Sequence, residues 1–368
     1  MNLNRKIRVL VVDDSAVVRQ AITQVLSQDP EIEVVGSACD PYVARDKILE
    51  LNPDVLTLDI EMPRMDGLTF LRILQKHRPM PVVVVSSVTS AGSRAALEAL
   101  EAGAVDVIAK PGSAWSIDQL HEQLLVRVKG AAFARVPAPG NEAKKSSSPA
   151  GTLDPRLLHS RQLIVFGAST GGTEALKNVL TQLPPGLPGI CIVQHIPPVF
   201  SRAFAERLND LCAFEVREAR QNDVVRAGLA LVAPGDYHMT VVWKNDHYEA
   251  VLNQNPALHH TRPAVDVLFN SAAACAGAKI VAVLLTGMGS DGASGMQKLK
   301  AAGAVTFAQN EATCVVYGMP RAAVELGVVD QVLPLDKIPL ALLRAVQSGT
   351  ASTQNTTTTA LHSTVVKS

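Results

Sequence analysis

Short apolar runs that alternate with amphipathic stretches constrain the fold of this chain more than any other feature. In the first part of the chain the runs are IRVLVV, DVLTLDI, PVVVVSS and DVIAKP, and later they are QLIVFGA, GICIVQH, LALVAPG, IVAVLLTG and AVTFAQN. Between them lie helix-like segments such as AVVRQAITQVLSQ and TEALKNVLTQL. Continuous β-branched runs that alternate with helices are typical of parallel sheets covered on both faces. The sequence therefore predicts two α/β halves.

A segment without apolar periodicity separates these halves. Its sequence, VPAPGNEAKKSSSPAGTLDP, is rich in Pro, Ser, Gly and Ala, so it cannot bury enough apolar surface to offset its ordering entropy. We expect a first domain over residues 1–130, a flexible linker over 131–160, a second domain over 161–347 and a disordered tail over 348–368. In the second domain, MTVVWKNDHYEAVLN predicts a β-hairpin that turns at Lys244–Asp246.

Composition argues against several classes of protein. The 34 basic residues balance the 34 acidic residues, which does not favour a nucleic-acid partner or a membrane surface. The five cysteines are scattered and include no C-x-x-C pair, which argues against a disulfide framework or a zinc ribbon. No apolar run approaches the ~20 residues that span a bilayer, and the N-terminus lacks a signal-peptide core. We expect a cytoplasmic protein without membrane insertion.

Acidic side chains follow two of the first apolar runs. Asp13 and Asp14 come after IRVLVV, and Asp59 comes after DVLTL. In parallel sheets ligands bind beyond the carboxyl ends of the strands, and neighbouring strands would bring these carboxylates close together. Such a cluster repels itself unless a hard divalent cation is present. The pattern therefore indicates a Mg²⁺ site.

Two further runs end in residues that suit phosphate chemistry. Ser86 ends PVVVV, and Lys110 follows DVIA. A nucleophilic carboxylate, a metal site and a cationic donor are the parts needed to form an acyl phosphate. Taken singly, each has a simpler explanation, because an Asp at a strand end is often a helix cap and a Lys is usually a solvated surface group.

Three complementary groups follow three runs of the second half. Ser169 lies in the small-residue turn of QLIVFGASTGG, His195 ends GICIVQH, and Asp291 lies in LLTGMGSDG. A serine in such a turn can attack a carbonyl if a base takes its proton. His195 is a candidate for that base, and Asp291 for the carboxylate that orients the imidazole.

Several alternatives remain open from the residues alone. Glycines at a strand-to-helix turn also suit phosphates, so GASTGG is compatible with a nucleotide cradle, although it matches neither dinucleotide nor P-loop patterns. His238, His259 and His260 are rival bases, and Asp291 is placed where it would also cap the following helix. G-x-S-x-G is absent and the chain order is Ser, His, Asp, which disfavours an ordinary α/β-hydrolase.

The first half resembles the response-regulator receiver domain over roughly residues 7–129, through VVDDSAVVR, TLDIEMPRMDGLTFL, VVVVSS and AKP. The resemblance implies a flavodoxin-like fold with a five-stranded parallel sheet and phosphorylation of Asp59 by a histidine kinase. It also implies Ser86 as the switch hydroxyl and Lys110 as a phosphate contact. The implied Mg²⁺ ligands are Asp14, Asp59, Asp13 through water and the backbone carbonyl of Glu61.

The second half resembles the catalytic domain of chemotaxis protein-glutamate methylesterases, the CheB family, from about residue 163 to residue 343. The resemblance is carried by FGASTGG, QHIPPVFSRAFAERL, APGDYHM, TRPAVDVLF, LLTGMGSDG and QNEATCVVYGMPRAA. It implies a doubly wound, mainly parallel α/β domain with Ser169 as nucleophile, His195 as general base and Asp291 as orienting carboxylate.

The same resemblance implies further site residues and an activity. The backbone amide of Met288 would be the oxyanion donor, with Thr170 nearby, and Arg262 would line the substrate cleft. The expected reaction is phosphorylation-activated hydrolysis of glutamyl methyl esters on chemotaxis receptors, with deamidation of glutamines and no cofactor in this domain. The alternative is a receiver joined to a non-catalytic nucleotide-binding module.

Overall fold

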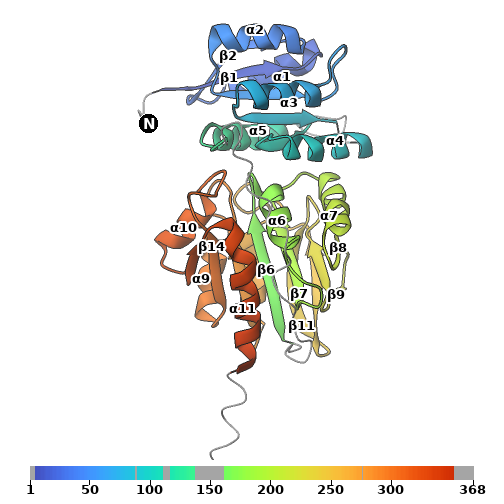
Figure 1. The fold of residues 1–368 in the computed structure, drawn as a ribbon, viewed down its shortest axis with the longest axis vertical. Coiled ribbons are helices and arrows are strands. Elements are labelled where there is room, and N and C mark those ends of the chain that lie inside the picture. Colours follow the sequence, from blue (N-terminus) through green and yellow to red (C-terminus); the bar gives the residue numbers. More distant parts are fainter. Residues whose placement is uncertain (1–4, 88, 111–116, 137–160, 276, 352–368) are drawn as a thin grey trace, which may run out of the picture.

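A computed structural model describes residues 5–87, 89–110, 117–136, 161–275 and 277–351, and these form two α/β units (Figure 1). The linker expected over 131–160 and the tail expected over 348–368 lie largely outside the described residues. None of the helices within the described ranges has both the length and the apolar character that crossing a bilayer requires.

The N-terminal unit is a five-stranded parallel sheet with the strand order β2-β1-β3-β4-β5. This order confirms the flavodoxin-like fold expected from the sequence. The strands are β1 (Ile7–Val12), β2 (Ile32–Ala38), β3 (Val55–Asp59), β4 (Val82–Ser86) and β5 (Asp106–Ala109). The helices between and after them are α1 (Ala16–Leu26), α2 (Pro41–Leu51), α3 (Gly67–His77), α4 (Ser90–Glu101) and α5 (Ile117–Ala132).

Polar side chains fix where these helices begin. The first four helices each start at a residue whose side chain accepts a backbone N–H of the first turn, and these residues are Ser15, Asp40, Asp66 and Thr89. Such caps satisfy amides that have no partner within the helix. They leave Asp13 and Asp59 at the strand ends free for other contacts.

The C-terminal unit is a seven-stranded parallel sheet with the order β15-β14-β13-β6-β7-β10-β8. The strands are β6 (Gln162–Ala168), β7 (Gly189–Gln194), β8 (Glu215–Glu218), β10 (Leu229–Val232), β13 (Lys279–Leu284), β14 (Val305–Gln309) and β15 (Gln331–Leu333). The helices are α6 (Gly172–Leu180), α7 (Phe200–Leu211), α8 (Val265–Ala273), α9 (Ala293–Ala301), α10 (Met319–Glu325) and α11 (Ile338–Ala351), with a 3-10 turn at Leu335–Lys337.

Helices cover both faces of this sheet, as the continuous apolar runs predict. Ile164 and Phe166 of β6 pack in the same cluster as α6, α7 and α11. The alternate residues Leu163 and Val165 pack in the cluster that contains α8 and α9. Because successive strand residues point to opposite faces, one strand contributes to both layers.

The predicted hairpin is confirmed. Strands β11 (His238–Lys244) and β12 (His247–Asn253) pair antiparallel, and β9 (Asp223–Val225) joins them in a small sheet. Asn245 and Asp246 in the turn have φ of 49° and 59°. Two left-handed residues define the turn type that matches the twist of a hairpin.

One predicted boundary differs from the structure. The tail was expected from residue 348, but α11 continues to Ala351. Val346 and Leu342 keep the helix buried, and the side chain of Gln162 donates to the carbonyl of Val346 (2.8 Å). The helix therefore runs one turn further than the apolar period alone indicates.

The N-terminal unit rests on one end of the C-terminal unit, with α4 and α5 facing it (Figure 1). Helix α4 packs against α7 and α6. At the end of α4, Glu101 pairs with Lys177 and with Arg207 (3.2 Å each). The two units are therefore in direct contact beside the carboxyl ends of β6 and β7.

Candidate active site

Ser169 follows β6 directly, in a tight turn before α6. Its backbone N–H donates to the carbonyl of Thr286 (3.0 Å), which ties the turn to the end of β13. Gly171 has a φ of 74°, which a residue with a Cβ rarely adopts. A Cβ on Gly287 would lie 2.6 Å from that of Ser169. The glycines therefore allow the two loops to meet around the serine.

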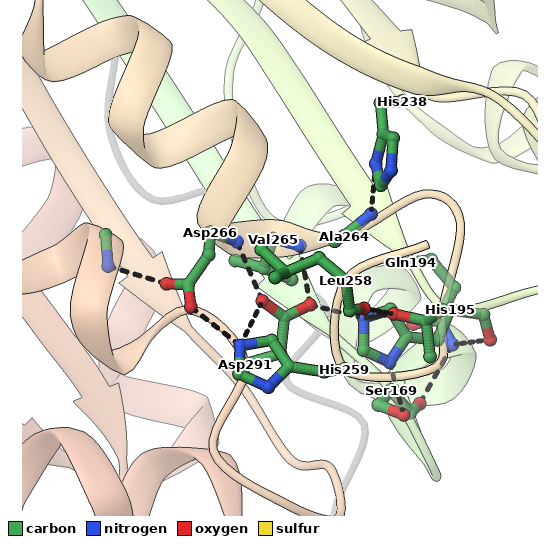
Figure 2. Close-up of polar contacts among 12 residues, drawn as sticks. Ser169, Gln194, His195, His238, Leu258, His259, Ala264, Val265, Asp266 and Asp291 are labelled. Carbon is green, nitrogen blue, oxygen red and sulfur yellow. Dashed lines mark hydrogen bonds and ion pairs between the residues drawn. The ribbon is translucent and has the colours of Figure 1, made fainter. Parts of the chain in front are cut away.

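Ser169, His195 and Asp291 are joined in a chain of hydrogen bonds (Figure 2). Oγ of Ser169 lies 3.1 Å from Nδ1 of His195, and Nε2 of His195 lies 2.8 Å from Oδ2 of Asp291. All three residues are buried. The bond to Asp291 requires the proton of the neutral ring to be on Nε2, so Nδ1 is free to accept the serine proton. The arrangement suits nucleophilic attack on a carbonyl.

Asp291 is held by the start of α8. It accepts from the backbone N–H groups of Val265 (2.7 Å) and Asp266 (2.8 Å). Burial acts to raise the pKa of Asp291, but the bond and charge of His195 and the two amides outweigh it, so the pKa lies below its ordinary value. Asp291 therefore stays ionised beside the imidazole, and it caps α8 rather than the helix that follows it.

Gln194 belongs to this site, although the sequence did not predict it. Its amide nitrogen donates to the carbonyls of Ser169 (2.9 Å) and His195 (3.1 Å). It thereby ties the backbone of β6 to that of β7 behind the two side chains. The only indication of its role in the sequence is its position next to His195. That position does not reveal which backbone carbonyls its side chain reaches.

The rival histidines have other partners. Nδ1 of His238 accepts from the N–H of Ala264 (3.2 Å), and Nε2 lies 3.1 Å from the carbonyl of Pro256. His259 contacts Asp266. His260 lies beside it in the same loop. Of the four histidines considered, the structure brings His195 to Ser169.

Of the residues expected around the oxyanion and the substrate, two adjoin the N-terminal unit and one binds a neighbouring loop. Thr170 and Met288 both contact the N-terminal unit, as described below. Arg262 binds Asp236 (2.6 Å) and donates to the carbonyls of Gln254 and Asn255 (3.0 Å each). Its guanidinium thus holds the loop before it, and a role in lining the substrate cleft stays a prediction.

The acidic cluster of the N-terminal unit gathers at the end of its sheet. Nζ of Lys110 lies 2.7 Å from Oδ2 of Asp59 and 3.2 Å from Oδ2 of Asp13. Burial raises the pKa of Asp59 to about 6, against the lowering effects of Lys110 and the N–H of Glu61. Carboxylate oxygens of Asp13, Asp14 and Asp59 lie within 4.8 Å of one another.

This cluster fits a divalent cation. Oδ2 of Asp13 and Oδ2 of Asp59 are buried and accept no well-directed hydrogen bond from a described residue. Two buried carboxylates that share one ammonium, with a third carboxylate beside them, favour a hard cation such as Mg²⁺. Ser86 is buried beside them and donates to the carbonyl of Gly92 (3.1 Å). The side chain of Glu61 instead accepts from Ser87 (2.7 Å).

Asp106 of β5 links the N-terminal unit to the serine turn. Its Oδ2 accepts from the hydroxyl of Thr170 (2.7 Å), and its Oδ1 pairs with Arg127 of α5. Arg127 also reaches the carbonyl of His195 (3.4 Å). A Cβ added to Gly130 of α5 would lie 3.2 Å from Sδ of Met288. The N-terminal unit therefore packs on residues that adjoin Ser169.

Comparison with known proteins gives two family matches. Residues 164–342 match the family described as CheB methylesterase, and residues 9–124 match the family described as response regulator receiver domain. These two matches cover the two units of the structure.

Similar proteins match over most of the chain. Protein-glutamate methylesterase/protein-glutamine glutaminase 2 of Syntrophus aciditrophicus is 54% identical over 93% of this chain and 99% of its own. The protein of the same description from Pseudomonas aeruginosa is 52% identical over 92% of this chain and 96% of its own. The crystal structure of the Thermotoga maritima CheB methylesterase catalytic domain covers 50% of this chain and 99% of its own, with 38% identity and a TM-score of 0.49.

Proposed function

Because this chain belongs to the CheB methylesterase family and carries a response regulator receiver domain, we propose that Ser169, His195 and Asp291 carry out its reaction. The chain is a phosphorylation-regulated protein-glutamate methylesterase and protein-glutamine glutaminase. The observation that supports this assignment is the buried chain of hydrogen bonds from Ser169 through His195 to Asp291.

The reaction proceeds by acyl transfer. Oγ of Ser169 attacks the γ-carbonyl carbon of a glutamyl methyl ester, and its proton passes to Nδ1 of His195. The bond to the methoxy oxygen then breaks, and the same proton converts the leaving group to methanol. Water, deprotonated at Nδ1, attacks the acyl-serine and releases glutamate and free Ser169. With a glutamine side chain, the leaving group is ammonia.

Asp291 and the oxyanion donors act on the charges that develop. The carboxylate of Asp291 stabilises the imidazolium that forms when His195 takes the proton. We assign the backbone amide of Met288 to the oxyanion, with Thr170 beside it. A single donor aimed at an oxyanion contributes roughly 3 kcal/mol to lowering the barrier.

We propose chemotaxis receptors as the protein substrates and a histidine kinase as the phosphodonor to Asp59. Asp14 and Asp59, with Asp13 through water and the carbonyl of Glu61, would hold Mg²⁺. When bound, the ion supplies positive charge for the incoming phosphoryl group. Lys110 already contacts Asp59 (2.7 Å) and is placed to bind a phosphoryl oxygen there.

The contact between the units suggests how phosphorylation controls the esterase. Asp106 and Arg127 of the receiver bind Thr170 and the carbonyl of His195. In this arrangement the receiver covers residues that the substrate must approach. A receiver in the same chain stays at high local concentration, so a modest interface is enough for occlusion. Phosphorylation at Asp59 would weaken this interface and open the site.

The alternative of a nucleotide-binding module finds no support in the comparisons, which match esterases over this domain. The GASTGG turn also presents a serine to a histidine rather than an open glycine cradle.

The proposal is tested by methanol release from methylated receptor membranes, with and without a small-molecule phosphodonor. Release should rise with the phosphodonor, vanish in Ser169→Ala and stay at the basal rate in Asp59→Asn. Release by Ser169→Ala at the wild-type rate would show that the nucleophile is misassigned. A response to the phosphodonor in Asp59→Asn would show that another residue is phosphorylated.

A further inference from the structure

Two carboxylates beside the catalytic histidine cap each other's helices. Asp291 precedes α9 and accepts from the first amides of α8, at Val265 and Asp266. In return, the side chain of Asp266 accepts from the N–H of Gly295 in the first turn of α9 (2.6 Å). Both aspartates are buried, with exposed fractions of 2% and 3%. The position of Asp291 therefore depends on that of Asp266.

His259 contacts this pair of carboxylates. Its Nε2 lies 3.0 Å from Oδ2 of Asp266 and 3.9 Å from Oδ1 of Asp291. In Figure 2 its ring lies beside Asp291 on the side away from His195. The three side chains offer ligand atoms within 4.8 Å of one another. The two carboxylates already accept hydrogen bonds from amides of α8 and α9 and from the N–H of His259, so the cluster needs no metal ion to hold it together.

The backbone holds His259 in an uncommon conformation. Leu258 and Thr261 exchange two backbone hydrogen bonds (3.1 and 3.0 Å) around His259 and His260, whose φ values are 53° and 60°. Such a two-residue turn favours Gly and Asn, because most other residues with a Cβ are disfavoured in left-handed backbone. The hydroxyl oxygen of Thr261 lies 3.4 Å from Nε2 of His195. The turn therefore reaches both the imidazole and the carboxylates.

We propose that His259 is a positioning residue of the esterase: its Nε2–H holds Asp266, and Asp266 in turn fixes the amides that orient Asp291 toward His195. This inference rests on the proposed roles of Ser169, His195 and Asp291. Without the donor, Asp266 faces Asp291 as a second buried carboxylate with one partner fewer. It must then rotate or take up a proton, and either change disturbs the amides that hold Asp291.

The expected effect falls on kcat rather than on KM. Asp291 acts when the imidazolium forms, and His259 contacts the two carboxylates rather than Ser169 or the ring of His195. Small misplacements of a catalytic group cost large factors in rate. We therefore expect loss of the donor to lower kcat about tenfold and leave KM within about twofold.

The test uses the full chain with phosphodonor, so that occlusion by the receiver does not limit the rate. His259→Asn suits the left-handed backbone but is too short to carry a donor to Asp266, so it should fold well and lose kcat about tenfold. His259→Gln reaches further and should keep kcat within about threefold. His260→Asn makes the same change at the neighbouring turn position and should keep kcat within about twofold. Methanol release and thermal unfolding are measured for each variant.

Several outcomes would overturn the inference. These are an unchanged kcat in His259→Asn, an equal loss in His260→Asn, no recovery in His259→Gln, or a change confined to KM. Ser169→Ala and Asp291→Asn are measured in parallel. Full activity in those two variants would refute the proposed catalytic residues themselves. Inactivity there with an unaffected His259→Asn would refute only the role of His259.

Discussion

His195 and His238 differ in whether the group that faces Nδ1 can also accept a hydrogen bond. In His195 the carboxylate of Asp291 faces Nε2 and the hydroxyl of Ser169 faces Nδ1. In His238 the N–H of Ala264 points at Nδ1 and the carbonyl of Pro256 faces Nε2. An amide N–H can only donate, so protonation of His238 would place two N–H groups against each other. Protonation of His238 therefore costs it the bond to Ala264, whereas the hydroxyl of Ser169 that faces Nδ1 of His195 can also accept.

This difference predicts an acid-sensitive component of stability. Burial lowers the pKa of His238 below its ordinary value, so as the pH falls the unfolded chain takes up a proton before the folded chain does. The free energy of unfolding should fall below about pH 6.5, by up to about 1.4 kcal/mol per pH unit, until the pH reaches the folded-state pKa. Urea unfolding from about pH 7.5 to pH 5 should show this component in the wild type but not in His238→Gln. Equal pH slopes in the two proteins would contradict it.

For single residues, the sequence predicted which side chains form the site better than it predicted what each of them contacts. Ser169, His195 and Asp291 each follow a strand, so their meeting at one edge could be expected from topology. Three features could not be read from spacing, because they depend on side-chain rotamers and loop packing. These are the orientation of the His195 ring, the hold of Gln194 on two carbonyls, and the binding of Asp291 to α8.

At the scale of elements, hydrophobic periodicity predicted both sheets and the hairpin. Four consecutive valines of β4 are fully or almost fully buried, as expected for a strand covered on both faces. The end of α11 was less predictable, because its last turn has no strong apolar period. The packing of α4 and α5 on the other unit was not predictable either, because a contact between units leaves little trace in a local pattern.

Helix α5 offers a direct test of occlusion. Gly130 lies so close to Met288 that an added Cβ would be 3.2 Å from its Sδ. The larger side chain of a leucine would press on Met288 and on Oγ1 of Thr170, 3.6 Å from the same Cβ, and overpacked contacts are costly. Gly130→Leu should raise methanol release by the unphosphorylated protein about fivefold or more and change the phosphorylated rate little.

Val126 provides a matched control on the same helix. Its side chain is 40% exposed, so Val126→Leu should leave the basal rate unchanged. A basal rate in Gly130→Leu equal to or below that of the wild type would show that α5 does not restrict the site. Thermal unfolding of both variants separates this result from loss of the receiver fold.

At the scale of the whole molecule, the interface combines buried and exposed polar contacts. Asp106 is buried against Thr170 and Arg127, whereas Glu101 meets Lys177 and Arg207 at the rim. Exposed ion pairs contribute about 0–1 kcal/mol each and are screened by salt, whereas buried pairs are screened much less. The two sets should therefore respond differently to ionic strength.

Glu101→Gln removes the rim pairs without changing the size of the side chain. It should raise the basal rate of methanol release about two- to fivefold at low salt. Added salt should raise the basal rate of the wild type toward that of the variant and affect the variant less. The measurement is basal methanol release across a salt series, and parallel salt responses would show that these pairs do not hold the units together.

The apolar part of the same interface has a consequence for temperature. Leu97 and Leu100 of α4 belong to one continuous cluster with Phe204 and Leu208 of α7. Separating the units exposes these side chains to water, so opening carries a positive heat-capacity change. Hydrophobic contacts weaken on cooling, and the closed form loses part of its advantage in the cold. A larger fraction of the unphosphorylated enzyme would then be open at low temperature, and that fraction would be set by the interface rather than by the signal.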